Sequence, residues 1–134
     1  MVGVTDGDTL TLLDSARTRY KVRLAGIDAP EMDQPFGQRS KRELSRIAFG
    51  TDVVVVTTKR DRYGRVVGKV IVNGTDVGLR QIEQGLAWHY KEYMREQAKA
   101  DRDVYAAAEE RARGSGIGLW ADNAPTPPWE WRHR

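Results

Sequence analysis

Three short segments of the chain carry carboxylates and arginines at spacings that could bind a cation and a phosphate. Residues 6–9 read Asp-Gly-Asp-Thr, where the glycine lets the backbone turn sharply between two carboxylates. Residues 28–31 read Asp-Ala-Pro-Glu and follow an expected strand that carries Arg23. Residues 61–65 read Asp-Arg-Tyr-Gly-Arg, typical of a turn that presents Arg65 at the start of a strand. Each segment alone also fits an ordinary polar turn, so the inference depends on their combination.

The combination favours a hard divalent cation and phosphodiester chemistry. Carboxylate oxygens suit Ca²⁺ or Mg²⁺ rather than zinc. Asp8 and Asp28 alone cannot saturate such a cation, so water, a carbonyl and a substrate phosphate oxygen would complete the ligands. Arginine matches a phosphate with its planar fork, and a third carboxylate near the metal could take a proton from water. Phosphoryl transfer needs mainly positioning and charge neutralisation, which these residue types supply.

Other polar and aromatic residues give weaker signals. The chain has two histidines, and His133 lies in the tail, so histidine catalysis is not expected. His89 lies among aromatic residues, and we expect it at the rim of the fold or on a binding surface. Tyr63, Tyr90 and Tyr93 could stack on bases or simply pack in the fold.

Composition limits the class of protein. A chain of 134 residues is a usual size for one domain, and the absence of cysteine excludes disulfides and thiolate metal sites. The net charge of +3 leans only weakly toward polyanions, and no apolar stretch approaches the length of a membrane span. No signal peptide opens the chain, and the first motif follows after only four residues. If an N-terminal signal has been removed, we expect a secreted or periplasmic protein; otherwise the compartment is open.

Residue periodicity predicts a small α+β, mainly β, fold. Alternation and β-branched residues predict strands at 9–13, 20–27, 53–58 and 66–72. Helical spacing predicts helices at 37–49, 77–84 and 98–113, and the Pro- and Trp-rich tail from about 121 to 134 is expected to be extended. About five short strands with helices inserted late fit a small closed barrel of the OB type or an open antiparallel sheet.

The ordered motifs resemble the staphylococcal nuclease (thermonuclease) family. The matching pieces are residues 4–9, 22–31, 61–65 and 84–87, and residues 118–120 and 128–132 also resemble bacterial members. Four motifs in order at compatible spacing are a much stronger signal than any one of them. The resemblance covers nearly the whole chain. It implies one domain over residues 1–134, built as a five-stranded OB-fold barrel with three α-helices.

The resemblance also implies an activity and a role for each motif residue. A family member is expected to be a Ca²⁺-dependent endonuclease that cuts DNA and RNA by water attack on phosphorus and leaves 3′-phosphate ends. By motif match, one calcium ion is held by Asp8, Asp28 and the backbone carbonyl of Ala29, with Asp6 nearby as a supporting carboxylate. Glu31 matches the general base. Arg23 and Arg65 match the two phosphate-clamping arginines. The nucleic-acid contacts fall on Tyr63, Arg62 and Tyr90.

Two other functions use the same residue types. An OB-type module that grips single strands without cutting them needs aromatic and basic surfaces, but it does not need Asp8, Asp28 and Glu31 together. A phosphodiesterase for small nucleotides is also compatible with these residue types. The partners expected for a nuclease are DNA and RNA, with single strands preferred, and we expect a monomer that does not bind membranes.

Overall fold

The computed structural model describes residues 3–133, so residues 1, 2 and 134 of the expected domain and tail lie outside the described part. None of the helices in the described range combines the length and apolar character needed to cross a lipid bilayer. The elements, in chain order, are β1 (Gly3–Asp6), β2 (Thr9–Leu13), β3 (Arg19–Leu24), β4 (Ile27–Asp28), α1 (Gly37–Ala48), β5 (Val54–Arg60), β6 (Val66–Val72), β7 (Thr75–Asp76), α2 (Val77–Glu83), β8 (Trp88–His89), η1 (Lys91–Glu96), α3 (Lys99–Ser115), η2 (Gly118–Ala121) and α4 (Pro128–Trp131).

The main sheet has the strand order β1-β2-β3-β6-β5, with β7 paired to β6. Neighbouring strands are antiparallel except β3 and β6, which run parallel with Val22 opposite Val66. Strands β4 and β8 form a separate two-stranded ladder. The expected α+β fold with an OB-like arrangement is confirmed. The order of paired strands is open, with β1 and β5 at its two ends.

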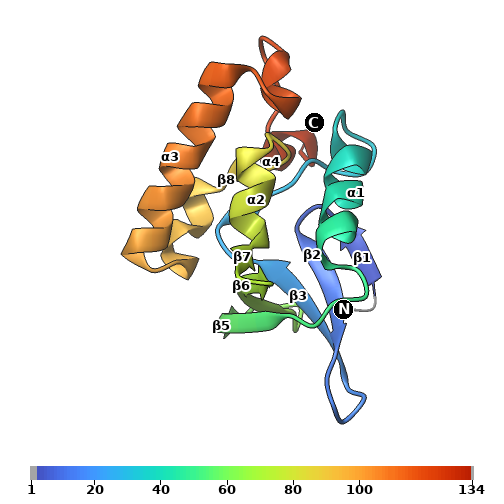
Figure 1. Cartoon of the computed structure of the whole chain (residues 1–134). Helices are drawn as coiled ribbons and strands as arrows, with labels where there is room; N and C mark the ends of the chain where they lie inside the picture. Colours follow the sequence, from blue (N-terminus) through green and yellow to red (C-terminus); the bar gives the residue numbers. More distant parts are fainter. Residues whose placement is uncertain (1–2, 134) are drawn as a thin grey trace.

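The helices lie together beside this sheet. Figure 1 shows α2 (yellow-green) between α1 (cyan) and α3 (orange), and α2 contacts both of them. On α1 the buried positions recur every three or four residues, so one stripe of the helix faces the interior. The shared core combines this stripe with the inner faces of the strands and helices, and includes Leu10, Val22, Leu24, Ile27, Leu44, Val70, Val77, Ile82 and Tyr105.

Most predicted elements are present, and two predictions were wrong in detail. The strand expected over residues 20–27 stops at Leu24, because Gly26 has a left-handed φ of +76° and turns the chain. A Cβ there would also meet the end of the Gln97 side chain at 2.2 Å, so a larger residue would have to displace that side chain as well as adopt the strained φ. The tail is also not wholly extended: one helical turn, α4, begins at Pro128. Proline is well placed in a first turn, where its missing N–H has no partner to lose.

Candidate active site

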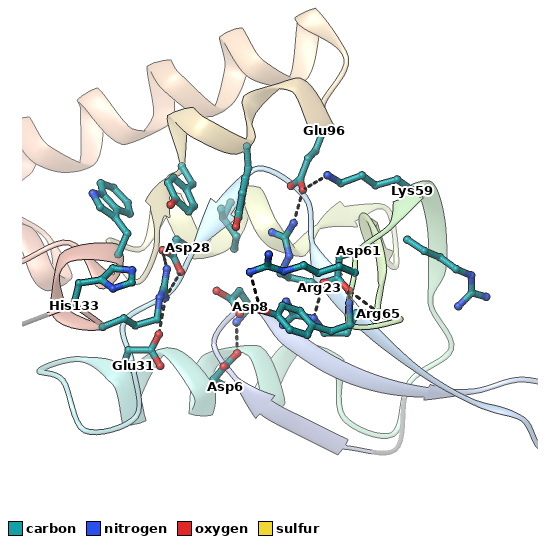
Figure 2. Close-up of a pocket in the computed structure, with 18 residues that line it drawn as sticks. Asp6, Asp8, Arg23, Asp28, Glu31, Lys59, Asp61, Arg65, Glu96 and His133 are labelled. Atoms are coloured by element: carbon teal, nitrogen blue, oxygen red, sulfur yellow. Dashed lines mark hydrogen bonds and ion pairs between the residues drawn. The ribbon is translucent and has the colours of Figure 1, made fainter.

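The predicted site residues converge on one open pocket of about 780 Å³. Its walls come from the β1–β2 turn, strand β3, the segment after β4, the β5–β6 hairpin and the C-terminal tail (Figure 2). Every predicted site residue except Ala29 lines it, namely Asp6, Asp8, Arg23, Asp28, Glu31, Arg62, Tyr63, Arg65 and Tyr90. Residues far apart in the sequence therefore share one solvent-accessible volume.

The β1–β2 turn holds Asp8 in place from behind. A Cβ added to Gly7 would lie 1.8 Å from the Ser40 hydroxyl oxygen, so only glycine fits between the turn and α1. The buried Gln81 amide of α2 donates to the Gly7 carbonyl at 2.9 Å and to the Ser40 carbonyl at 2.9 Å. Helices α1 and α2 thus clamp the backbone of this turn, and Asp8 projects from its other side.

The Asp8 carboxylate is buried among other acidic groups. Its Oδ2 accepts a hydrogen bond from the Ala29 N–H at 2.8 Å, and its Oδ1 accepts one from the Thr9 hydroxyl at 3.0 Å. Burial raises the pKa of Asp8 well above its ordinary value, and the nearby charges of Asp6 and Asp28 raise it further. A cation would relieve both the desolvation and the repulsion. Ala29 is not among the residues that line the pocket, but its N–H ties the β4 segment to Asp8.

Asp28 and Glu31 come from the short β4 strand and the loop after it. Strand β4 pairs with β8, with Asp28 opposite Trp88, which fixes where the loop begins. The Glu31 N–H donates to the Gln34 side chain at 3.0 Å, and this buried glutamine donates in turn to the Thr126 carbonyl at 2.5 Å. The loop is therefore held partly by the C-terminal tail.

The tail also contributes a cation that sequence reasoning missed. Arg132 donates to Asp28 through both terminal nitrogens, at 3.1 and 2.8 Å, and to Glu31 at 2.6 Å. Burial still raises the pKa of Asp28 above its ordinary value, although the hydrogen bonds and charge of Arg132 act to lower it. The hydrogen bonds to Asp28 contribute most to raising the pKa of Arg132 above its ordinary range. Its only sequence signal is its place in the segment 128–132, which does not reveal its partners.

Arg23 lies on β3 and is almost completely buried at the back of the pocket. Its Nη2 donates to the buried carboxylate of Glu96, at the end of η1. Within residues 3–133 its Nη1 is buried without a hydrogen-bond partner. An unsatisfied guanidinium N–H is costly in a protein interior, so this group suits an anion entering the pocket. Glu96 also accepts from the Gly26 N–H at 3.2 Å and pairs with Lys59 at 3.4 Å. Glu96 and Lys59 were not predicted as site residues.

Arg65 sits at the mouth of the pocket in the β5–β6 hairpin. Asp61 accepts hydrogen bonds from the Tyr63 and Arg65 N–H groups at 2.9 and 3.0 Å, and from the Arg65 Nε at 2.7 Å. Partial burial acts to raise the pKa of Asp61, but these hydrogen bonds together hold it below its ordinary value. Asp61 therefore sets both the turn and the direction of Arg65. Arg62 is exposed in this turn and donates to the Tyr63 hydroxyl at 2.9 Å.

Another wall of the pocket is lined by the aromatic rings of Tyr90, Tyr93 and Trp129. Tyr90 is buried and stacks on Trp129 of α4, with ring centroids 4.7 Å apart and planes 10° from parallel. Tyr93 lies 4.3 Å from Tyr90, and the Arg23 guanidinium lies over the Tyr93 ring at 4.6 Å. Burial and a hydrogen bond to Glu92 raise the pKa of Tyr90 to about 12. This hydroxyl therefore stays neutral near pH 7.

The expectation for His89 was wrong in location. The ring is buried rather than at a rim or on a binding surface, with Nε2 3.0 Å from the Gln97 oxygen and Nδ1 2.8 Å from Lys91 Nζ. Burial lowers the pKa of His89 below its ordinary value, so the ring is a neutral structural group. The aromatic neighbours in the sequence indicated a surface, but β8 places this position inside the fold.

The donor set limits which metal the pocket could hold. In the part of the chain that the structure describes, no three His, Cys, Asp or Glu side chains are arranged to hold a metal ion together. Asp8 and Asp28 instead offer two buried carboxylates, and a guanidinium cation already lies on Asp28. The position thus attracts positive charge and supplies only oxygen. This fits a hard cation completed by water and substrate rather than a closed structural site.

Sequence comparisons match this chain to nucleases. The profile of the family described as Staphylococcal nuclease homologue matches residues 21–122. A Haemophilus influenzae protein named an uncharacterized endonuclease is 42% identical over 134 residues, covering 100% of this chain and 72% of its own length. An Escherichia coli protein with the same name is 38% identical over 135 residues, covering 100% of this chain and 84% of its own. Arabidopsis thaliana staphylococcal-like nuclease CAN1 is 40% identical over 114 residues, which is 85% of this chain but 33% of that protein.

Proposed function

Because the chain belongs to the staphylococcal nuclease family, we propose that it is a calcium-dependent endonuclease that hydrolyses phosphodiester bonds in DNA and RNA. The observation that carries the proposal is the convergence of three carboxylates and two arginines on one pocket. Asp8, Asp28 and Glu31 stand on one side, with Arg23 and Arg65 on the other. A module that only bound nucleic acid would have no use for this acidic group beside a phosphate site.

Asp8, Asp28 and the carbonyl of Ala29 would hold a calcium ion. The bound ion would supply positive charge that draws a phosphate oxygen into the pocket and offsets the charge that develops on it. Asp6 supports this position, since its Oδ1 accepts from the Asp8 N–H at 3.1 Å and fixes the turn.

The protein's own groups would divide the remaining work. Glu31 orients the attacking water and accepts its proton, which assists attack in line with the leaving 5′ oxygen. Arg23, whose Nη1 has no partner among the described residues, would bind the phosphate from β3, and Arg65 would bind it from the hairpin. Both neutralise charge on the five-coordinate phosphorus, and the products carry 3′-phosphate ends.

The substrate range follows from what the pocket can contact. Its lining offers guanidinium groups for the backbone and tyrosine rings for stacking, which suit both DNA and RNA. Tyr63 is 70% exposed at the rim, where it could stack on an unpaired base but not on one inside a duplex. We therefore expect single strands to be cut faster than duplexes, with Arg62 adding nonspecific attraction. A monomer carries the complete site.

Incubation of the protein with single-stranded DNA, duplex DNA and RNA in Ca²⁺, Mg²⁺ or EDTA tests the proposal. The expected result is cleavage of all three nucleic acids in Ca²⁺, fastest for single strands, with 3′-phosphate termini and no cleavage in EDTA. Full activity in EDTA would overturn the calcium dependence. Binding of single strands without any cleavage in Ca²⁺ would favour the binding module, and cleavage of small phosphodiesters alone would favour the nucleotide phosphodiesterase.

A further inference from the structure

The C-terminal residues 128–133 lie against the pocket, beyond the family match at residues 21–122. Three contacts hold this segment there. The Trp129 ring stacks on Tyr90, the Trp131 indole N–H donates to Asp33 at 3.0 Å, and Gln34 binds the carbonyl of Thr126 just before it. We call residues 128–133 the tail strap. Its aromatic anchors place the following residue, Arg132, over the carboxylates.

Arg132 makes the most direct contact of the tail strap with the site. Its two terminal nitrogens bind both oxygens of Asp28, and Nη1 also binds Glu31. Charge-assisted, two-pronged contacts of this kind are among the stronger hydrogen bonds in proteins. The Arg132 side chain is 39% exposed, so water can reach the pair and the contact can open. Arg132 therefore occupies the position that the proposed function assigns to the cation and to the attacking water.

Arg132 and a calcium ion would compete for the carboxylates of Asp28 and Glu31. A calcium ion on Asp28 needs at least one of the oxygens that Arg132 holds, and the two positive charges repel each other at this separation. Glu31 faces a similar conflict, because an oxygen already bound to a guanidinium is less available to a water molecule. Loading the site with a cation and opening Glu31 to water would therefore both favour release of Arg132.

We propose that Arg132 is an internal counter-ion that holds Asp28 and Glu31 in place until the divalent cation displaces it. This inference rests on the proposed cation site. Arg132 acts as a positioning residue: it neutralises a buried acidic cluster when the cation is absent and gives up its place when the cation binds. Arg132 lies at the end of the single helical turn α4, so its release loosens the tail strap.

Release of the strap would also change the aromatic wall. Trp129 lies three residues before Arg132 and covers one face of Tyr90, and this face becomes available when the strap moves. An exposed tyrosine face can stack on a base of the incoming strand. Cation binding and base stacking are thereby coupled through one short segment.

Calcium titration by isothermal calorimetry, without nucleic acid, tests the displacement. Removal of a competitor that occupies the site most of the time should tighten calcium binding by Arg132→Ala about 5- to 10-fold. Trp129→Ala leaves the charge unchanged but weakens the strap, so it should tighten binding about 2- to 3-fold. Arg111→Ala on α3 removes the same charge from an exposed position away from the pocket and should leave the affinity unchanged. Asp8→Asn should abolish the heat signal, which assigns it to this site.

Hydrogen exchange of the wild-type protein provides a second readout. The N–H groups of Trp131 and Arg132 bond to the carbonyls of Pro127 and Pro128, at 3.0 Å each, and are protected while the strap is folded. Calcium should speed their exchange, whereas a purely structural Arg132 would leave it unchanged.

The outcomes separate this inference from the proposed function. Equal or weaker calcium binding by Arg132→Ala, with normal binding by the wild type, would overturn the counter-ion role and leave the nuclease proposal intact. Tighter calcium binding by Arg132→Ala but not by Trp129→Ala would mean that only the charge of Arg132 matters, and it would overturn the displacement. Hydrogen exchange of the tail strap that calcium does not accelerate would overturn it too. Failure of wild type and variants alike to bind calcium would overturn both the cation site and this inference.

Discussion

The two sides of the Gly7–Asp8 turn are both buried and polar, yet they are built in opposite ways. Behind the turn, the neutral Gln81 amide donates to the carbonyls of Gly7 and Ser40, and the Ser40 hydroxyl donates to the Leu86 carbonyl at 2.7 Å. In front of it, Asp8 faces other carboxylates, and the charges that offset them come from distant segments. We call the first group, Gly7, Ser40, Gln81 and Leu86, the rear network. We call the carboxylates of the pocket, Asp6, Asp8, Asp28 and Glu31, the front cluster.

The difference separates support from chemistry. A buried neutral network supports a fold without needing any ligand, although the Gln81 Oε1 has no partner among the described residues. A buried cluster of like charges is costly unless a counter-charge arrives, so it is retained where binding or catalysis uses it. Substitutions in the front cluster should therefore lower turnover more than stability, and substitutions in the rear network should do the reverse.

The largest expected effect is that of Glu31→Gln in the front cluster. This change keeps the shape of the side chain but removes its ability to take a proton, and general-base assistance is typically worth about 10²–10⁴-fold in rate. We expect kcat on a single-stranded oligonucleotide in Ca²⁺ to fall by at least that factor, with KM nearly unchanged. Near-normal turnover would remove Glu31 from the reaction.

The next effect distinguishes two arginines of the same hairpin. Loss of an arginine that binds transition-state charge typically lowers kcat about 10²–10³-fold, and we expect this for Arg65→Ala. Arg65→Lys should also fail, since a point charge cannot keep both the Nε contact to Asp61 and a phosphate contact.

Arg62→Ala is the matched control for Arg65. Arg62 is exposed and should add only screened attraction, so its loss should raise KM by about threefold or less, and mainly at low salt. Similar, mild effects of all three variants would mean that the hairpin is only structural and that the front cluster is not the active site.

A smaller effect is expected at Glu96, which acts through Arg23. Glu96→Ala leaves the Arg23 guanidinium without its buried partner, and we expect kcat to fall about 10-fold as the side chain loses its fixed direction. Glu96→Gln keeps one oxygen that can still accept from Arg23, but its NH2 group then faces the Gly26 N–H, so it should recover only part of kcat. Glu43→Gln on α1, which pairs with Arg46, should change nothing. Equal losses in both Glu96 variants would contradict a positioning role.

The smallest effect on turnover should accompany a clear loss of stability, in the rear network. Gln81→Ala removes the amide that donates to the buried Gly7 carbonyl, at a cost of about 1–3 kcal/mol in the free energy of unfolding. Urea denaturation measures this loss, and kcat of the folded protein should stay within about twofold. Gln38→Ala removes the same side chain from the exposed face of α1 and should leave both quantities unchanged. Lost turnover at full stability in Gln81→Ala would show that the network tunes Asp8 directly.

The sequence by itself determined the local elements and the motif residues. Apolar alternation and helical spacing reflect contacts a few residues apart, so they located most strands and the helices α1, α2 and α3. Eight predicted site residues of the ordered motifs, and Tyr90 beyond them, line one pocket, although their individual roles stay predictions. The same local rules missed the break at Gly26, because glycine fits both extended and left-handed backbone and its identity does not show which of the two the fold uses.

Only the tertiary structure decided which charges meet. Glu96 reaches Arg23 across 73 residues, and Arg132 reaches Asp28 across 104, through the path of the whole chain. A charged residue in a sequence has many possible partners, and its hydrophilic character predicts a solvated position rather than a particular contact. The burial of His89 follows the same logic, because the pairing of β8 with β4 and the packing of α3 enclose it. Periodicity records which face of an element is buried, whereas pairing depends on where distant elements are brought together by the fold.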